Sequence, residues 1–307
     1  MKHWQMIITG VIIGTSVRLI MLKIDYRQYP GYPHGYVVHL TLGFVAAALG
    51  GLVIPALIEE SYVAVTFLAL AVQQFRAVRE AEREFLQELE ETELVNRGQA
   101  YIEGIAQVFE ARNYLAMITA FITTVGYYTC DLLNPIPLLS LVGGITSGGL
   151  VAYLLHVLMS EKTVGDIAEV KVVDLEFCGG NNKNIAVEEV VIMNVGLDES
   201  LQKWKESGLG IVIAPKDDNA RATLANTGQR QAIIHDLTTQ LGVQLDLGVQ
   251  DYTPLARLNI NTGRVCLIVI PIEKDEGCIK QAVSNTPILE GVKRRPLDSK
   301  VGKKAAD

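Results

Sequence analysis

Long apolar runs separated by short polar stretches occupy the first 160 residues, and no run of comparable length follows them. An α-helix needs about 20 mostly apolar residues to cross the hydrocarbon core of a bilayer. Five runs approach or reach that length: Met6–Leu22, Tyr36–Ile58, Tyr62–Phe75, Tyr114–Leu133 and Ile136–Leu158. The pattern therefore predicts an α-helical transmembrane domain of about five spans over residues 1–160.

The third run, Tyr62–Phe75, is the weakest of the five. It is short, and the polar side chains of Gln73 and Gln74 would have to reach out of the apolar layer at its end. A four-span arrangement, in which Tyr62–Phe75 is re-entrant or lies at the membrane surface, is the alternative to five spans.

Basic residues gather on one side of the predicted membrane when the N-terminus is placed outside. The segments facing the cytosol then carry or adjoin Arg18, Lys23, Arg27, Arg76, Arg79, Arg83, Arg97 and Arg112, whereas the external segments carry Lys2 alone. Cytosolic loops of membrane proteins are enriched in Lys and Arg. We therefore expect a multi-pass protein of the cytoplasmic (cell) membrane, with its N-terminus outside and its C-terminal domain cytosolic. With four spans and a cytosolic C-terminus, the N-terminus would lie inside.

A charged segment after the third run continues the helical pattern out of the apolar layer. In Arg76–Glu93 the apolar positions recur at helical spacing, at Val78, Phe85, Leu86 and Leu89. Gly98 stands where a helix commonly ends, and a second helical pattern begins near Gln99. Residues 76–113 are therefore expected to form a cytosolic helical hairpin within the membrane domain.

The pattern after Glu161 is that of a soluble α/β domain, expected over residues 161–292. Strand-like runs are Val170–Phe177, Ile185–Val195, Gly210–Ala214, Ala256–Ile260 and Arg264–Ile270, and helical patterns are Asp198–Ser207, Asp217–Leu241 and Lys274–Ser284. Asn226-Thr227-Gly228 predicts a break in the second helical pattern, and Asn261-Thr262-Gly263 predicts a hairpin turn between the last two strands. Residues 293–307 are expected to be a basic, disordered tail.

Composition and charge exclude some functions. The chain is 49% hydrophobic with a mean hydropathy of +0.26, and its formal net charge of −7 argues against a nucleic-acid partner. The four cysteines, at positions 130, 178, 266 and 278, include no pair spaced as a metal or redox motif. No glycine-rich nucleotide-binding motif occurs either, so neither a metal nor a cofactor is predicted.

A six-residue motif, Tyr101-Ile102-Glu103-Gly104-Ile105-Ala106, lies in the hairpin. It resembles the signature of the YIEGIA family of Bacillus- and Clostridium-type Firmicutes. The neighbouring segments Pro55–Glu59, Thr66–Ala71, Gln73–Arg76 and Glu110–Tyr114 support the resemblance. The resemblance implies a sporulation-associated integral membrane protein that takes part in a heteromeric complex, with a small capping subunit as a possible partner. It implies no catalytic residues.

Two carboxylates are the candidates for chemistry in the motif helix. Glu103 and Glu110 are seven residues apart, so they share one helical face about 10 Å apart along the axis. Such a pair is able to bind a cation or to carry out acid–base catalysis. The alternative is that this face is simply the solvated side of an amphipathic helix.

Four further polar residues are expected near the cytosolic surface of the membrane: Arg18, His39, Arg112 and His156. Polar groups at membrane depth are candidates for function. A metal site formed by the two histidines and Glu103 has no ligand motif to support it. In the C-terminal domain, Lys216, Arg221 and Arg230 near a helix start are candidates for holding an anion.

Two functions from different classes fit this sequence. The first is an anchor, assembly or regulatory component of a sporulation-associated membrane complex, in contact with membrane lipid and with a protein partner bound by the α/β domain. The second is a membrane-associated hydrolase, directed at protein or lipid, that uses Glu103 or Glu110. The sequence favours the first, non-enzymatic function.

Overall fold

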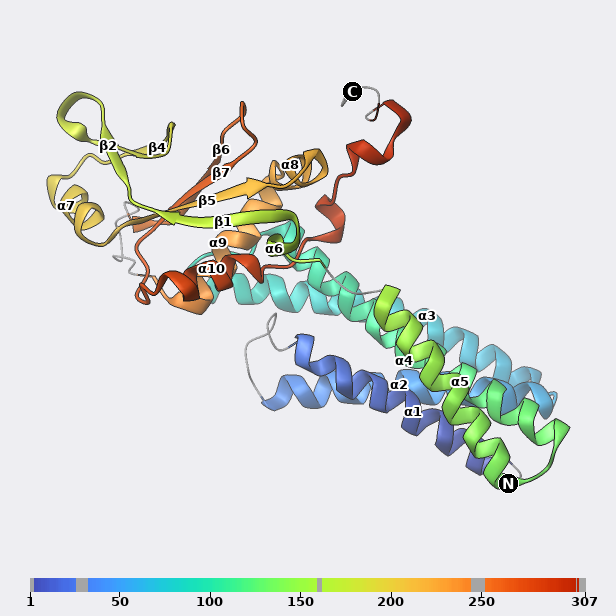
Figure 1. Cartoon of the computed structure of the whole chain (residues 1–307). Helices are drawn as coiled ribbons and strands as arrows, with labels where there is room; N and C mark the ends of the chain where they lie inside the picture. Colours follow the sequence, from blue (N-terminus) through green and yellow to red (C-terminus); the bar gives the residue numbers. More distant parts are fainter. Residues whose placement is uncertain (1–2, 26–32, 159–161, 244–251, 302, 304–307) are drawn as a thin grey trace. The chain divides into compact units, whose positions relative to one another are not determined.

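The computed structural model describes residues 3–25, 33–158, 162–243, 252–301 and 303 (Figure 1). The chain divides into two compact units. The first unit comprises Met1–Phe85 and Ile105–Ser160, and the second comprises Leu86–Gly104 and Glu161–Asp307. The predicted membrane domain included the whole hairpin of residues 76–113. In the structure the tip of that hairpin, Leu86–Gly104, is grouped with the C-terminal part of the chain.

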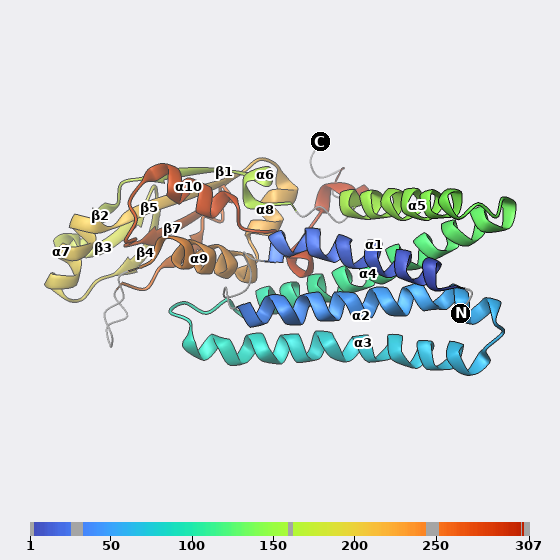
Figure 2. The same ribbon diagram turned by 90° about the horizontal axis from the view of Figure 1, so that it is seen from below.

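Five long helices build the first unit and lie side by side (Figures 1 and 2). They are α1 (Trp4–Asp25), α2 (Pro33–Ile58), α3 (Tyr62–Leu89), α4 (Gln99–Leu133) and α5 (Pro137–Leu158). The ends of α3 and α4 that adjoin the hairpin turn belong to the second unit. A short turn joins the last two helices, because α4 ends at Leu133 and Pro137 begins α5.

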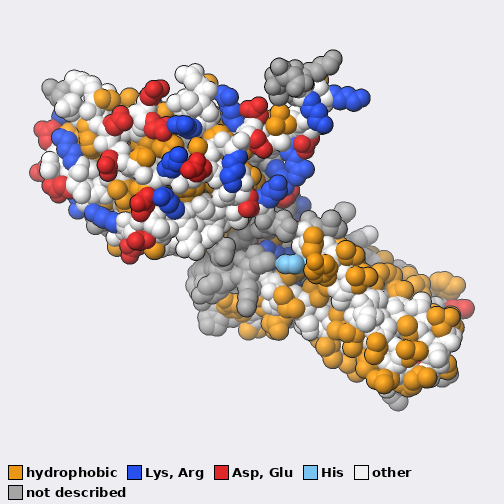
Figure 3. Space-filling view, in the orientation of Figure 1, with side chains coloured by type: hydrophobic (Ala, Val, Ile, Leu, Met, Phe, Trp, Pro, Cys, Tyr) orange, Lys and Arg blue, Asp and Glu red, His pale blue; other side chains and the backbone are white. Residues whose placement is uncertain are grey.

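Four of these helices are long and apolar enough to span a membrane: Trp4–Leu22, Tyr36–Ile58, Gln99–Leu133 and Pro137–Val157. Apolar side chains cover the visible face of this unit (Figure 3). Helix α3 is not among the four in the described part of the chain. Its apolar first half continues directly into the charged segment from Arg76, so no window of sufficient length is apolar throughout. By length and composition, four helices are therefore candidate spans, and α3, which contains the weakest of the five predicted runs, is not one of them in the described part of the chain.

Small residues allow the helices of the first unit to approach closely. A Cβ atom added at Gly10 would lie 2.7 Å from Cγ2 of Thr124, and one added at Gly14 would lie 2.7 Å from the carbonyl oxygen of Ala116. Gly144 faces Thr123 in the same way across the α4–α5 contact, at 3.1 Å. The spacing of these glycines therefore reflects helix packing, as is common in membrane helices.

The second unit combines helices with two antiparallel sheets. The larger sheet has the order β1-β5-β7-β6, and the smaller has the order β2-β3-β4. Their strands are β1 (Ala168–Val173), β2 (Glu176–Cys178), β3 (Asn184–Val187), β4 (Val190–Asn194), β5 (Leu209–Pro215), β6 (Leu255–Leu258) and β7 (Val265–Val269). The helices are α6 (Val164–Ile167), α7 (Asp198–Ser207), α8 (Asp218–Leu224), α9 (Thr227–Leu241) and α10 (Glu276–Ser284).

Strands β5 and β7 are buried on both faces, which explains why their sequences are apolar throughout. On one face, Ile211 and Ile213 pack with residues of α9 and α10 such as Leu237. On the other face, Val212 packs with Trp204 of α7 and with the small sheet. The larger sheet is therefore the middle layer of three, with α9 and α10 on one face and α7 and the small sheet on the other.

The helix break and the hairpin turn predicted for this unit are confirmed, whereas two strand predictions are not. Asn226 caps α9 by accepting a 2.8 Å hydrogen bond from the Gly228 amide, and the turn at Asn261–Gly263 joins β6 to β7. Two predictions were wrong. Val170–Phe177 is not one strand, since β1 and β2 belong to different sheets. Ile185–Val195 is a hairpin of β3 and β4, which turns at Glu188 with a φ of 52°.

Residues 293–307 were predicted to be a disordered tail, but the first residues of this segment are bound to the fold. Two short 3₁₀ turns, Glu290–Val292 and Pro296–Asp298, follow one another, and the second lies along α8. The Leu297 amide donates a 2.9 Å hydrogen bond to Oδ1 of Asn219, and the Arg294 amide donates one of 3.1 Å to Oγ1 of Thr223. Residues 302 and 304–307 of the predicted tail lie outside the described residues.

Candidate functional site

The hairpin motif begins helix α4, directly after a sharp turn. Gly98 has a φ of 82°, a conformation that favours glycine, and α4 starts at the next residue. Tyr101, Ile102 and Gly104 are buried, whereas Glu103 is half-buried. The division between the two units falls inside the motif, after Gly104, so Ile105 and Ala106 belong to the first unit, where they too are buried.

Tyr101 forms the most direct polar contact between the motif and the C-terminal part of the chain. Its hydroxyl donates a 2.8 Å hydrogen bond to Oδ1 of Asp236 on α9, which is only 8% exposed. Burial raises the pKa of the Asp236 carboxyl from 3.8 to about 6, although hydrogen bonds from Tyr101 and Thr286 oppose the rise. A buried carboxylate is costly unless it is hydrogen-bonded, so this bond stabilises the contact.

The neighbouring His235 makes a second contact between α9 and the hairpin. Its Nδ1–H donates a 2.7 Å hydrogen bond to the carbonyl oxygen of Val95, and its ring stands edge-on to the ring of Tyr101 with centroids 5.9 Å apart. Burial lowers the pKa of His235, which favours the neutral ring. The Nε2 atom then accepts a bond from Oγ1 of Thr239 at 3.4 Å. His235 is thus a core residue that fastens the hairpin.

Apolar packing reinforces these polar contacts. Val95 is buried in the same core cluster as Leu237 and the inner face of the larger sheet. The methyl group of Ala100 lies so close to Gly228 that a Cβ atom there would be 2.5 Å away from it. Gln231 adds a 2.5 Å hydrogen bond from its side-chain amide to the carbonyl oxygen of Asn96. The hairpin tip is therefore part of the core of the second unit.

Acidic side chains hold the turn of the hairpin itself. The Glu90 carboxylate accepts hydrogen bonds from the backbone amides of Arg97 and Gly98, at 2.9 and 3.1 Å. The guanidinium of Arg97, which is 5% exposed, donates a 2.6 Å bond to Glu93 and lies 3.8 Å from Glu90. A charge so deeply buried requires such partners.

The two candidate carboxylates differ in their surroundings. Glu110 lies in the first unit and forms a 3.4 Å ion pair with Arg79 of α3. Glu103 lies in the second unit on the half-buried face of the motif. Within the described residues, no group of three or more His, Cys, Asp or Glu side chains is close enough to hold a metal ion. Within that part of the chain, neither glutamate therefore belongs to a group able to hold a metal ion.

Arg18 and His39 come together inside the first unit. Arg18 is fully buried, and its Nη2 donates a 3.3 Å hydrogen bond to Nδ1 of His39. Both side chains pack on the ring of Phe109, with the guanidinium carbon 5.4 Å and the imidazole centroid 4.5 Å from it. Gly43 leaves the space that the stem of Arg18 fills. Cation–π contact and a histidine acceptor together stabilise the buried charge.

The other two predicted polar candidates lie elsewhere in the first unit. Arg112 is buried on α4, with 5% of its surface exposed, next to the almost wholly buried Asn113. His156 is exposed in the last turn of α5. Within the described residues no group of three or more ligating side chains is formed, so a metal site made of the two histidines and Glu103 is not seen there.

The three candidate anion-binding residues of the second unit all donate hydrogen bonds to backbone carbonyl oxygens. The ammonium of Lys216 donates to the carbonyl oxygens of Gly165 and Asp166, at 2.7 and 2.9 Å. The guanidinium of Arg221 likewise donates to the carbonyl oxygen of Ile260 at 2.8 Å, and Arg230 to that of Ala256 at 3.4 Å. These cations bind backbone carbonyls of the fold.

Comparisons with known proteins agree with the signature. A sequence model of the family described as YIEGIA protein matches residues 6–299. The chain belongs to the YIEGIA family. It is 41% identical over 292 residues to "Uncharacterized protein YphB" of Bacillus subtilis (strain 168), a match that covers 95% of this chain and 94% of the relative. No solved structure matches the chain.

The first residue of the YIEGIA signature thus bonds to α9 within the second unit, and sequence reasoning missed the α9 residues that bind the hairpin. Asp236 and Gln231 lie far along the chain, on a helix whose polar residues look like an ordinary solvated face. The only signal in the sequence was that α9 carries a histidine and an aspartate side by side within an apolar pattern, at His235 and Asp236. Their partners follow only from the fold.

Proposed function

We propose that this YIEGIA protein is an anchor and assembly component of a membrane complex in spore formation, whose second unit binds a protein partner. The observation that carries this proposal is the bond between Tyr101 and Asp236. Tyr101 lies in the first turn of α4, whose residues up to Gly104 belong to the second unit and whose later residues belong to the apolar first unit. Helix α4 thus contributes residues to both units, as expected of a component that carries its anchor and its binding domain in one chain.

The proposal places the second unit in the cytosol and the N-terminus outside the cytoplasmic membrane. The distribution of Lys and Arg along the sequence supports this orientation. It requires the first half of α3 to cross the apolar layer as a fifth span. The strongly exposed apolar side chains of Tyr62, Val63 and Phe67, at 79%, 83% and 68%, are suited to contact with lipid there. Fourteen residues of helix rise about 21 Å, so the bilayer must thin or the helix must extend into its charged half.

Sporulation and a heteromeric complex enter the proposal through the family resemblance. Acidic and basic side chains intermingle on the visible face of the second unit, as on a surface that meets other proteins in water (Figure 3). Membrane lipid surrounds the first unit in this account. A small capping subunit is a natural candidate for the protein partner.

The test is co-purification of the tagged full-length protein from sporulating cells, with the partners identified by mass spectrometry. Val95→Asp should abolish both the complex and function, because it places a charge in the core of the second unit. Leu94→Asp is the matched control, since Leu94 is 68% exposed and its replacement should leave both intact. Glu103→Gln should also leave both intact. Loss of function with an intact complex in Glu103→Gln would instead favour a hydrolase.

A further inference from the structure

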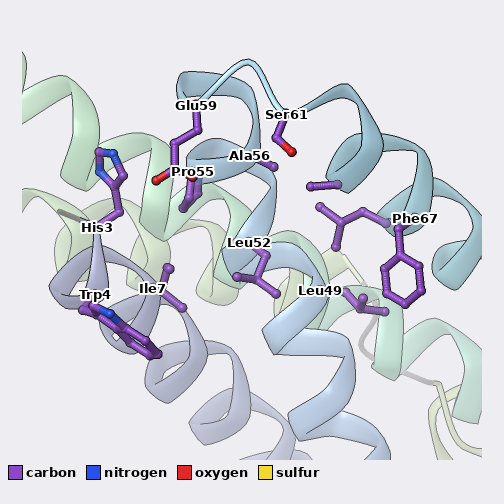
Figure 4. A pocket seen from close by; sticks show the side chains of 12 residues that line it. His3, Trp4, Ile7, Leu49, Leu52, Pro55, Ala56, Glu59, Ser61 and Phe67 are labelled. Atoms are coloured by element: carbon purple, nitrogen blue, oxygen red, sulfur yellow. The ribbon is translucent and has the colours of Figure 1, made fainter. Parts of the chain in front are cut away.

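A cavity of about 410 Å³ opens in the first unit, where α1 begins, α2 ends and α3 begins (Figure 4). Its floor is formed by α2, through Leu49, Leu52 and Pro55. Its two sides are formed by Ile7 of α1 and by Phe67 of α3. The volume lies within the range of about 300 to 1,000 Å³ that is usual for ligand sites, and apolar walls with a few polar groups are typical of them.

The polar groups of the cavity are gathered at one end. His3, Glu59 and Ser61 lie at the end next to the turn between α2 and α3, and the Glu59 side chain extends over the cavity from that turn (Figure 4). Glu59 is exposed and forms no ion pair with the described residues. Among the described residues that line it, the cavity thus has an apolar body and one carboxylate, that of Glu59, at its rim.

We propose that this cavity binds an acyl chain of a bilayer phospholipid whose head group carries an amine. Three of its lining residues, Trp4, Leu52 and Phe67, also belong to the exposed apolar surface of the first unit, at 56%, 39% and 68%. The cavity therefore opens sideways toward the medium that covers this surface, and a chain from that medium enters without crossing water. The chain would lie over Leu52 between α1 and α3.

The charge of the rim selects among lipid head groups. An ammonium group at the head donates charge-assisted hydrogen bonds to the Glu59 carboxylate, whereas a head that carries only a phosphate is repelled by it. Ser61 has a hydroxyl that can accept or donate a further bond. A tryptophan beside the rim, Trp4, is the residue type that prefers the boundary between head groups and chains. Phosphatidylethanolamine has both the chain and the ammonium that the cavity requires.

The test is native mass spectrometry of the full-length protein in detergent micelles, titrated with phosphatidylethanolamine or phosphatidylglycerol of identical chains. The wild-type protein should bind one phosphatidylethanolamine with saturation and should bind phosphatidylglycerol about tenfold more weakly, the effect of one charge-assisted bond. Equal binding of the two lipids by the wild-type protein would overturn the assignment of the head group.

Two matched substitutions on α3 test the cavity itself. Ala64 lines the cavity, and Ala64→Trp should fill it and weaken phosphatidylethanolamine binding at least about tenfold. Val63 is the adjacent residue and does not line it, so Val63→Trp should bind as the wild type does. Ala64→Leu introduces a smaller side chain and should also weaken lipid binding. It replaces Ala64→Trp in the test if the tryptophan variant fails to fold. Unchanged binding in a folded Ala64 variant would overturn the proposal.

A third variant separates the head group from the chain. Glu59→Gln keeps the size of the side chain and removes its charge. It should bring the two lipids to nearly equal affinity, while the apolar contacts still hold the chain. Retention of the wild-type preference in Glu59→Gln would show that the carboxylate is not the group that selects the amine. This outcome would leave the proposal of a protein partner for the second unit unaffected, because the experiment measures only lipid binding.

Discussion

Tyr101 donates a hydrogen bond of 2.8 Å to Asp236, a residue 135 positions further along the chain. Tyr101 is the first residue of the signature motif, and Asp236 lies on the helix that packs against the larger sheet of the second unit. The bond therefore joins the helical hairpin to the C-terminal part of the chain. The first residue of the motif therefore has a structural role, which does not depend on catalysis.

Loss of the Tyr101 hydroxyl should destabilise the second unit. Tyr101→Phe keeps the ring but leaves a buried carboxylate short of a donor, which costs about 1–3 kcal/mol. The measurement is thermal unfolding of the purified protein, followed by the fluorescence of the fully buried Trp204 in a Trp4→Phe background. Tyr153→Phe is the control, because Tyr153 is 66% exposed on α5. Equal melting temperatures of Tyr101→Phe and the control would contradict the role of the bond.

Asp236 should make the stability of the second unit depend on pH. Its folded-state pKa of about 6 lies above the ordinary 3.8, so the folded state binds the proton more tightly than the unfolded state does. The contribution of Asp236 to stability is therefore full below about pH 4, falls as the pH rises to about 6 and is constant above that, over a range of at most about 3 kcal/mol.

The comparison that isolates this effect is urea unfolding of the wild type and of Asp236→Asn at several pH values. Asparagine does not titrate, and its carbonyl oxygen still accepts the bond from Tyr101. The difference in unfolding free energy between the two proteins should change between pH 4 and pH 6 and then level off. A difference that stays constant across this interval would show that the Asp236 carboxyl is not shifted.

The buried ion pairs of the hairpin turn should matter more than exposed pairs of the same type. Arg97→Met removes the cation from two glutamates and should cost about 3 kcal/mol, as is usual when one partner of a buried pair is lost. Arg83→Met removes an exposed pair with Glu80 and should change stability by less than about 1 kcal/mol. The same thermal unfolding assay applies. Similar losses in both variants would mean that the turn is not held by Arg97.

The packing of Arg18 gives a test within the first unit. A Cβ atom at Gly43 would collide with the side chain of Arg18, so Gly43→Ala should lower the melting temperature in detergent. Gly149 has open space around its Cα, and Gly149→Ala should be neutral or stabilising by about 0.5–1 kcal/mol, the helix preference of alanine. If Gly43→Ala were as stable as Gly149→Ala, the close contact between α1 and α2 at Arg18 would not exist.

Local features of this fold were predictable because they depend on neighbouring residues. The break at Gly98 and the start of α9 at Thr227 follow from turn and capping preferences. The strand order β1-β5-β7-β6 was not predictable, because it depends on pairings between segments far apart in sequence. For the same reason the motif was found as a pattern, but its partner Asp236 was not.

The number of membrane spans in the first unit was also only partly predictable from the sequence. Hydropathy identified four of them by length and composition alone, but α3 is apolar in one half and charged in the other. A sequence window averages over both halves, so the pattern leaves the number of crossings open between four and five. The exposed apolar side chains of its first half are information that only the fold provides.

Labelling of single cysteines in intact cells tests the central claim, that the helices cross the cytoplasmic membrane and hold the second unit in the cytosol. In a chain without its native cysteines, Ser61→Cys marks the turn between α2 and α3, and Lys280→Cys marks the surface of α10. A membrane-impermeant maleimide should label the cysteine at position 61 in intact cells and the one at position 280 only after permeabilisation. Equal labelling of the two positions in intact cells would contradict the account.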